Sequence, residues 1–294
     1  MTLQIIANGI VLSLVYALVA IGLTMVYGVM RILNWAHGEI VMLGAFVGWL
    51  VVVVLGLNFV LALVVSMLSM AALGVGIERV MFRPMRGKAH LTPFIMSMGL
   101  VFVLQVVAIV AFGVTDKAIP TVFPGTLIFA GTVMPVERLA LIPIAGGLTV
   151  GYYIFLQRTK QGRAIRAAAQ DATGAVLQGI SINRCALIAM STGCALAGAA
   201  GVLIAPIFTV NPFMGTKLVW KAFVIVFVGG MGSVVGTILG AFLIGFTGSI
   251  VGTLVDPKWV TMIEMLILGL ILLFRPGGNH NVEQNGYQNM HVVW

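Results

Sequence analysis

The chain has 294 residues, of which 61% are hydrophobic and 8% are charged, and its formal net charge is +8. Soluble domains carry about a quarter charged residues to cover their surface, so this composition excludes an ordinary soluble globule. Lipid admits only α-helices and closed β-barrels, and a barrel would show alternating segments of about ten residues. The apolar runs here are long and continuous, so the sequence predicts an all-α polytopic membrane protein.

The first apolar run begins at residue 5, and no Lys or Arg precedes it. A cleavable signal peptide needs a basic stretch before its apolar core, so we expect this run to stay as the first membrane span. About 20 residues cross the hydrocarbon core. Eight runs approach or exceed that length, namely residues 5–26, 40–57, 59–77, 93–112, 139–156, 185–204, 222–255 and 259–274.

The seventh run is too long for a single crossing. It contains Gly229, Gly230 and Gly232, so we expect a break there, giving either two crossings or a re-entrant half followed by a full crossing. The prediction is therefore eight to nine transmembrane helices in a domain of residues 1–275. The tail, residues 276–294, is rich in Asn, Gly and Gln and is predicted to be polar and flexible.

Basic residues between the spans predict the orientation. If the seventh run crosses twice, eleven lie on one side: Arg31, Arg79, Arg83, Arg86, Lys88, Arg158, Lys160, Arg163, Arg166, Arg184 and Arg275. Five lie on the other: Lys117, Arg138, Lys217, Lys221 and Lys258. Cytoplasmic loops carry the excess of Lys and Arg, so we expect the N-terminus outside and the C-terminus inside a bacterial inner membrane. The outer segments 114–138 and 206–217 contain prolines and are predicted to be extended or loop-like.

The sequence offers little to a catalytic or nucleotide-binding site. Gly87-Lys88 is followed by Ala89, so the phosphate-binding Walker A pattern is not met, and we expect no ATP or other cofactor on this chain. His37 and Glu39 have no Cys or second His at ligand spacing nearby, which argues against a metal site.

Residues 34–39 leave two interpretations open. A functional site competes with a polar turn at the membrane interface in which Asn34 caps the next helix, and we favour the turn. Cys185 and Cys194 lie in one apolar run and are interpreted as small core residues.

Acidic residues bear on the energy source, because ion-coupled carriers use ionisable groups inside the membrane. Of the eight acidic residues, only Glu264 falls within an apolar run, little more than one turn from its start. We therefore expect that a partner supplies the energy of any active transport.

Small residues at four-residue spacing allow helices to approach closely in lipid, where leucine gains nothing from burial. The sequence has several such ladders: Gly44 and Gly48; Gly193, Ala197 and Gly201; Gly232, Gly236 and Gly240; Gly248 and Gly252. We favour helix packing over a direct role in lining a pathway.

The loop of residues 158–184 predicts a short helix outside the bilayer. Alanines at 164, 167, 168, 169, 172 and 175 favour helix, and Arg163, Arg166 and Gln170 recur at helical spacing to form a polar face. Gly162 can open this helix and Gly179 can close the turn after it. Two roles stay open from physics alone: attachment to anionic lipid, or docking of a partner.

In this loop the sequence resembles the coupling segment of branched-chain amino acid ABC permeases of the LivH type. The resemblance is carried by residues 159–167, by Gln170-Asp171 and by residues 175–180. Three other stretches agree: residues 27–29 with 32–38, residues 228–233, and residues 275–278. Trp35 stands where this family more often has Phe. The resemblance covers residues 1 to about 278.

The resemblance implies an ABC importer permease fold and a core of two related permeases, two cytoplasmic ATPases that use ATP and Mg, and a periplasmic substrate-binding protein. It places Gly162, Arg163, Arg166, Asp171, Leu177 and Gly179 on the surface that docks in an ATPase cleft. The outer segments 114–138 and 206–217 would meet the binding protein. The nearly uncharged walls suit an amino acid with an apolar side chain.

Other functions stay open at this stage. Urea and short-amide permeases share the same signatures. A self-sufficient secondary carrier or channel could use Glu264, and a membrane enzyme could use His37 and Glu39. These alternatives differ in whether separate ATPases are required.

Overall fold

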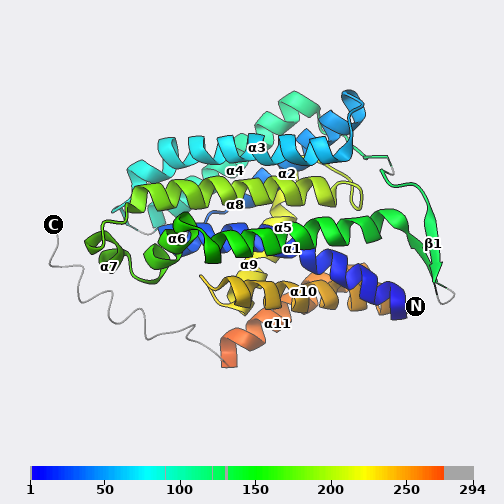
Figure 1. Ribbon diagram of the computed structural model, residues 1–294. Coiled ribbons are helices and arrows are strands. Elements are labelled where there is room, and N and C mark those ends of the chain that lie inside the picture. The colour runs from blue at the N-terminus through cyan, green and yellow to red at the C-terminus, as the bar shows by residue number, and fades with distance from the viewer. Residues whose placement is uncertain (1, 90, 121, 130–131, 275–294) are drawn as a thin grey trace.

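The computed structural model describes residues 2–89, 91–120, 122–129 and 132–274, so the tail 276–294 and Arg275 lie outside the described residues. Long helices run side by side, with one small β-hairpin beyond them (Figure 1). The α-helices are α1 (Thr2–Met30), α2 (His37–Trp49), α3 (Phe59–Ile77), α4 (Leu91–Phe112), α5 (Val136–Arg158), α6 (Lys160–Gln170), α7 (Ala172–Leu177), α8 (Ile182–Ile204), α9 (Met214–Gly229), α10 (Val234–Leu254) and α11 (Val260–Phe274). The shorter elements are β1 (Thr126–Phe129), β2 (Thr132–Pro135), π-helices Leu50–Val54 and Glu78–Phe82, and 3₁₀ turns Arg83–Met85 and Pro257–Trp259.

The molecule has two distinct ends. At one end, here named the α6 end, α7 extends beyond the long helices, and α6 packs beside the ends of α1, α5 and α8 (Figure 1). At the other, the hairpin end, β1 and β2 and the start of α1 lie together. Several apolar helices of membrane-spanning length are thus present as the sequence predicts, whereas the placement of α6 and α7 outside the bilayer stays a prediction.

Seven of the helical segments in the described part of the chain are long and apolar enough to cross a membrane. They contain α1, α2, α3, α4, α5, α8 and α10. Helices α9 and α11 are largely apolar but have 16 and 15 residues, and α9 contains Lys217 and Lys221. The predicted break in the run 222–255 is confirmed, because α9 ends at Gly229 and α10 begins at Val234. Gly230 and Gly232 there have φ values of 90° and 88°, which L side chains rarely adopt.

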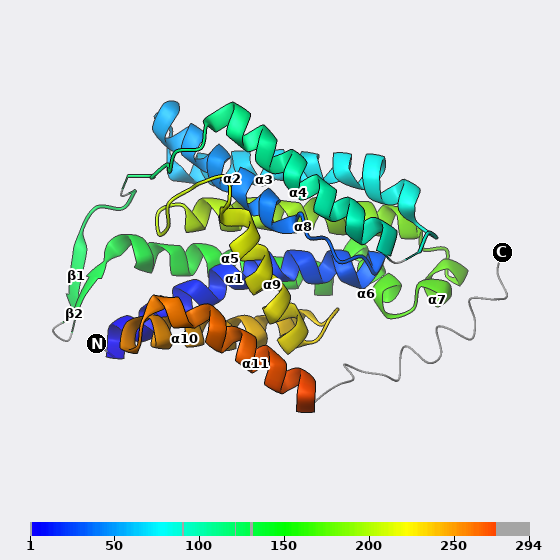
Figure 2. The same cartoon turned by 180° about the vertical axis from the view of Figure 1, so that it is seen from behind.

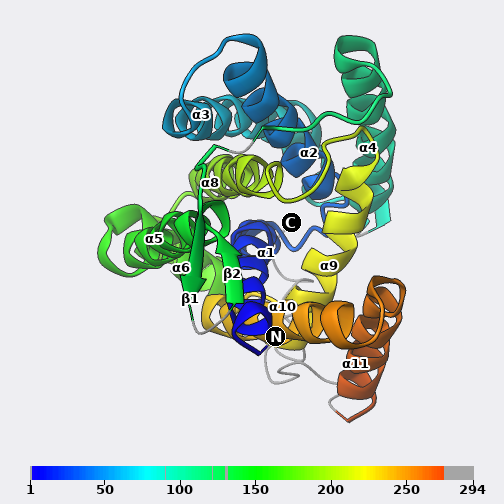
Figure 3. The ribbon, with the colours of Figure 1, turned by 90° about the vertical axis from the view of Figure 1, so that its right-hand side faces the viewer.

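Helix α1 is the centre of the bundle and packs against α10, α8 and α5 (Figures 2 and 3). Buried hydroxyl groups pair across these contacts because lipid would leave them unsatisfied. Thr24 and Thr237 hydrogen-bond at 2.8 Å between α1 and α10, and Ser249 of α10 donates to the carbonyl of Ile5 at 2.7 Å. The central helix is therefore held along most of its length.

Glycines bring α1, α2, α3 and α8 together. A methyl group on Gly44 would lie 2.6 Å from the Cα of Gly198, and one on Gly193 would lie 2.9 Å from the carbonyl oxygen of Gly22. The Ser66 hydroxyl lies 3.1 Å from the carbonyl oxygen of Gly44 and 3.0 Å from that of Gly198 and can donate to either. We name the contacts of Gly22, Gly44, Gly74, Gly193, Gly198 and Gly201 the glycine seam.

The other ladder positions divide into two kinds. Gly48 packs on Val202 and Gly240 on the Ile225 carbonyl, and Gly236 meets the Gly229 carbonyl still more closely. Gly232 instead lies in the α9–α10 turn with nothing within 4 Å of an added methyl group. Position 232 therefore requires glycine for its backbone conformation and not for helix packing.

The two segments at the hairpin end, 114–138 and 206–217, contain more regular structure than the loops that the sequence predicts. Segment 114–138 forms an antiparallel hairpin, with Thr126 opposite Pro135 and Phe129 opposite Thr132, and its last residues already belong to α5. Segment 206–217 is irregular only to Phe213, since α9 begins at Met214. The backbones of Lys117 and Val210 exchange two hydrogen bonds of 2.8 Å, which fasten the two segments to each other.

Candidate translocation site

The segment between α1 and α2 turns back into the bundle. His37 Nε2 lies 3.1 Å from the carbonyl oxygen of Val19, and His37 is fully buried. Val19 precedes the end of α1 by eleven residues, which at about 1.5 Å per residue places this contact roughly 16 Å inside the helix end. Helix α2 therefore starts within the bundle.

Our favoured interpretation of residues 34–39 as an interfacial turn is therefore wrong. Asn34 does not cap α2 either, because its Oδ1 accepts from the backbone N–H of Ala36 and no side chain caps that helix. Protein groups satisfy only part of the polarity of this stretch, because Asn34 Nδ2, His37 Nδ1 and Glu39 Oε2 are buried with no hydrogen-bond partner among the described residues. It is a candidate functional segment for that reason.

Glu39, in the first turn of α2, is the centre of a buried polar cluster. Its side chain is 1% exposed, and its Oε1 accepts from Gln105 Nε2 of α4 at 3.1 Å and from Thr216 Oγ1 of α9 at 3.3 Å. Its Oε2 packs against Gly215, where an added methyl group would lie 2.5 Å away. The described residues give Oε2 no hydrogen-bond partner. Three helices therefore meet at one carboxyl group.

An aromatic cluster lies beside this carboxyl group. Trp35 stacks on Phe223 with ring centroids 4.8 Å apart and meets Trp220 edge-on at 4.9 Å. Its backbone N–H donates to Ser97 Oγ of α4 at 3.1 Å. The segment before α2 thus holds α4 and α9 at a fixed spacing.

A buried ion pair joins α9 to α11. Lys221 Nζ lies 2.5 and 2.6 Å from the two carboxylate oxygens of Glu264, which is 1% exposed. The same ammonium group stands 5.5 Å from the ring centroid of Tyr16 in α1. Lys221 was expected in an outer loop, and this placement is wrong because the residue lies within α9.

The expectation that every acid but Glu264 lies in a loop or at a span end holds for Glu39, in the first turn of α2, but not for Glu78, which lies inside the apolar segment Phe59–Met85. Glu39 and Glu78 are each 1% exposed as well. Arg86 donates to Glu78 and to Asn183, which ties the end of α3 to the start of α8. Burial lowers the pKa of Arg86, and the neighbouring Glu78 carboxylate opposes that shift. Within the described residues, no group of three or more His, Cys, Asp or Glu side chains could hold a metal ion.

One face of α9 is left uncovered between α4 and α11 (Figure 3). Phe213, Lys217 and Trp220 are exposed on it, at spacings that place them along one side of the helix. Gln105 and Thr216, the partners of Glu39, are only partly buried at its margin. We name the exposed Lys217 and Trp220 together with Gln105, Thr216 and Lys221 the polar face.

The candidate coupling residues lie together at the α6 end. Thr159 caps α6, since its Oγ1 accepts from the N–H of Gly162 at 2.9 Å, and Asp171 separates α6 from α7. The predicted helix is thus two helices. Arg163, Asp171, Leu177 and Gly179 are exposed, and Leu177 is 81% exposed.

Two further candidates of this loop make internal contacts. Gly162 is buried, and a methyl group there would lie 2.5 Å from the Cα of Leu156. Arg166 is half-buried and its Nε donates to the Leu156 carbonyl at 3.1 Å. Both residues fasten α6 to the end of α5. Their assignment to a docking surface stays a prediction.

Sequence reasoning missed Gln105 and Thr216. Gln105 is a polar residue in the middle of the apolar run 93–112, and that signal was available. Thr216 carried no comparable signal, because it lies in a segment expected to be a loop.

Comparison with known proteins gives three findings. The family model described as branched-chain amino acid transport system, permease component, matches residues 5–275. The chain is 33% identical over 290 residues to the high-affinity branched-chain amino acid transport system permease protein BraD of Pseudomonas aeruginosa and 32% identical over 295 residues to LivH of Escherichia coli, covering 94% of each chain in both cases. Its fold is similar to PsaBC from Streptococcus pneumoniae in complex with Fab, with a TM-score of 0.50, 13% identity, and coverage of 92% of this chain and 91% of that one.

Proposed function

This chain belongs to the family of branched-chain amino acid transport permeases, and we propose that it is the membrane-spanning permease of an ATP-driven importer for aliphatic amino acids. The chain itself binds no nucleotide in this proposal, and separate ATPase subunits hydrolyse ATP. The other components are a second permease of the same family and a periplasmic binding protein. The match over nearly the whole chain to two branched-chain amino acid permeases is the observation that carries this proposal.

The exposed tip of α7 supports docking of a partner at the α6 end. Val176 and Leu177 are 56% and 81% exposed at a place where the long helices have already ended. Apolar side chains exposed in such a position mark interaction sites in soluble regions. Arg163 and Asp171 beside them add charges of both signs for specificity. We propose that this tip enters a cleft of the ATPase.

Basic residues support placing the α6 end in the cytoplasm. In the described residues, the loops and helix ends there carry Arg31, Arg79, Arg83, Arg86, Lys88, Arg158, Lys160, Arg163, Arg166 and Arg184. The hairpin end carries Lys117, Arg138 and Lys258. By the positive-inside rule the N-terminus then lies outside, and α9 and α11 complete nine crossing segments in a bacterial inner membrane.

The polar face supports a second permease beside α9. Charged side chains in membrane helices almost always point to a protein interior or a water-filled cavity, and Lys217 is exposed on α9. Lipid would have to solvate this ammonium group if nothing else covered it. We propose that the face between α4 and α11 borders the pathway shared with the second permease.

The docking proposal is tested by a matched pair of exposed residues. Leu177 and Val110 are both 81% exposed, the first on α7 and the second on α4. In liposomes that contain the permeases and the ATPases, with the binding protein and leucine added, we expect Leu177→Ala to lower substrate-stimulated ATP hydrolysis at least tenfold. Val110→Ala should leave it unchanged.

Equal hydrolysis in both variants would refute docking through α7. A second experiment tests the assignment to ATP-driven importers. Leucine uptake into liposomes that contain this chain alone, driven by an ion gradient, would refute that assignment. That outcome would favour a secondary carrier that uses Glu39 or Glu264.

A further inference from the structure

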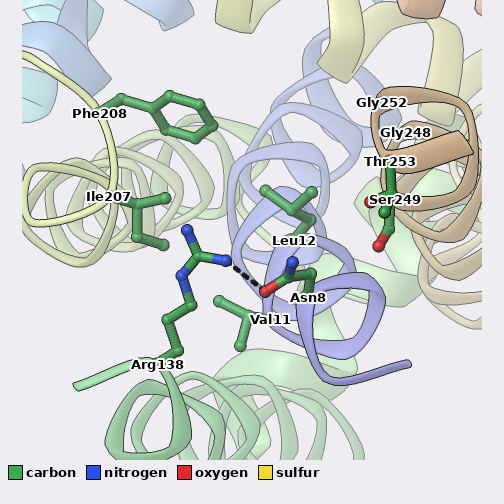
Figure 4. A pocket seen from close by; sticks show the side chains of 10 residues that line it. All are labelled: Asn8, Val11, Leu12, Arg138, Ile207, Phe208, Gly248, Ser249, Gly252 and Thr253. Carbon is green, nitrogen blue, oxygen red and sulfur yellow. Dashed lines mark hydrogen bonds between the residues drawn. The ribbon is translucent and has the colours of Figure 1, made fainter. Parts of the chain in front are cut away.

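A cavity of about 200 Å³ opens at the hairpin end between α1, α10 and the residues that follow α8 (Figure 4). One wall is formed by the first turns of α1 and another by the last turns of α10. Ile207 and Phe208 face it from the irregular segment before α9. Arg138, at the start of α5, reaches into the space between them.

Arg138 brings an unneutralised charge to this cavity. A guanidinium group has five N–H donors, and the described residues give it one hydrogen bond, from Nη1 to Oδ1 of Asn8. The ion pairs of the described residues involve Arg86 and Lys221, so no described carboxylate neutralises Arg138. Glu137 beside it accepts from the backbone N–H of Val122 at 3.0 Å. The remaining donors are available to an anionic ligand.

The side chains that line the cavity indicate the chemistry of the ligand beyond its anionic group. Val11, Leu12, Ile207 and Phe208 present apolar surface opposite the guanidinium group. A cavity of about 150 Å³ accommodates benzene, so the space here suits a slightly larger molecule with one anionic end and a short aliphatic chain.

The α10 wall of the cavity also lies close to the ion pair of α9 and α11. A methyl group on Gly248, which lines the cavity, would lie 3.7 Å from Oε1 of Glu264. On α1, Leu12 lines the cavity and Tyr16, one turn further along, lies under the Lys221 ammonium group. Residues that line the cavity are therefore neighbours of residues that contact this ion pair.

We propose that this cavity binds the carboxylate of an aliphatic amino acid through Arg138, with the aliphatic side chain against Ile207 and Phe208. This site would hold the substrate at its entry, and the inference rests on the proposed import function. Asn8 is a positioning residue, because it touches the guanidinium group and holds it over the cavity. The headgroup of an anionic lipid offers the same oxyanion chemistry, but the cavity is sized for a whole small molecule.

The test measures protection of a cysteine introduced at the cavity wall. Thr253 is exposed and lines the cavity, whereas the native Cys185 and Cys194 are 4% and 0% exposed. The full chain carrying Thr253→Cys is placed in phosphatidylcholine nanodiscs and labelled with a maleimide. We expect saturating leucine to slow labelling at least threefold and leucinamide, which lacks the carboxylate, to leave it unchanged.

Variants of Arg138 and its partner identify the recognising group. Charge-assisted hydrogen bonds are strong, so Arg138→Gln should raise the half-protecting concentration of leucine about tenfold or more. Arg138→Lys should retain part of the protection, which would show that a cation at this position is what the ligand requires. Asn8→Asp should weaken protection as well, because the new carboxylate would occupy the guanidinium group. Lys258→Gln, an exposed cation at the same end, is the matched control and should change nothing.

A second control is Leu177→Cys at the α6 end, whose labelling rate leucine should not alter. Equal protection by leucine and leucinamide, or unchanged protection in Arg138→Gln, would overturn the proposal. Protection that requires phosphatidylglycerol in the nanodisc and ignores leucine would overturn it too, in favour of a lipid site.

Uptake by the reconstituted importer separates this inference from the function on which it rests. If the unmodified chain with its partners takes up no leucine, the proposed function fails. If uptake is normal and Arg138→Gln leaves the KM for leucine-loaded binding protein and the uptake rate unchanged, only the entry site fails.

Discussion

The glycine seam and the polar face solve the problem of helix association in lipid in opposite ways. In the seam, α1, α2, α3 and α8 approach until backbone meets backbone, as at Gly44 and Gly198. Along α9, contacts to α4 and α11 rely on side-chain pairs, Thr216 with Gln105 and Lys221 with Glu264. The first kind of contact tolerates no added atom, and the second can open without a steric barrier.

This difference indicates which part of the bundle can move during transport. Packed cores behave as rigid units, because small changes in volume are resisted throughout. Helix α11 adjoins α10 and α9 and has exposed apolar side chains along its length. A permease must change its shape between outward-open and inward-open states. Helix α9 packs closely on α2 and α10, as at Gly215 and Gly229, so the contacts that allow such a change are those of α4 and α11 with α9.

The largest effect is expected from breaking the ion pair. Lys221→Met leaves Glu264 buried without its partner, and removing one member of a buried pair costs about 3 kcal/mol or more. Denaturant unfolding of the purified chain in detergent should show this loss. Lys217→Met, an exposed lysine one turn earlier, should change the free energy of unfolding by less than about 0.5 kcal/mol.

The double variant Lys221→Met, Glu264→Leu sharpens this prediction. Replacing both charges by apolar groups often restores stability, so the double variant should be more stable than Lys221→Met alone. Additive losses would show that the two residues stabilise the chain separately and that no pair joins α9 to α11.

A smaller effect is expected from one methyl group in the seam. Gly74 and Gly76 both lie in α3, but a methyl group on Gly74 would meet Cys194 Sγ at 2.7 Å, whereas one on Gly76 would meet nothing within 4 Å. Gly74→Ala should lower the free energy of unfolding by about 2 kcal/mol, a typical cost of overpacking. Gly76→Ala should leave it unchanged or slightly raised. Equal effects would mean that α3 and α8 are less closely packed than the seam requires.

The sequence predicted the helices well because lipid imposes one simple requirement on them. Runs such as 93–112 and 185–204 agree closely with α4 and α8, since a membrane segment must be apolar and satisfy its own backbone. The break after α9 was also predictable, because adjacent glycines permit the positive φ values of Gly230 and Gly232.

The depth of polar residues within the bundle and their pairing with one another could not be predicted in the same way. Residues 34–39 are polar, and polar groups usually lie where water is, so the pattern favoured an interfacial turn. In the structure the Val19 carbonyl and the side chains of Gln105 and Thr216 replace water. Lys221 adjoins the boundary of an apolar run, and its partner Glu264 is 43 residues away. Hydropathy carries no information about such tertiary contacts.

The smallest effect on stability is expected at Glu39. Glu39→Gln keeps an oxygen that can accept from Gln105 and Thr216, and both partners are only partly buried, so they can also bond to water. Its effect on the free energy of unfolding should stay within about 1 kcal/mol, against about 3 kcal/mol for the loss of Lys221. If Glu39→Gln destabilised the chain as much as Lys221→Met, the carboxyl group at the start of α2 would be a structural centre as rigid as the glycine seam. The contact between α9 and α11 would then be the one remaining contact that can open during transport.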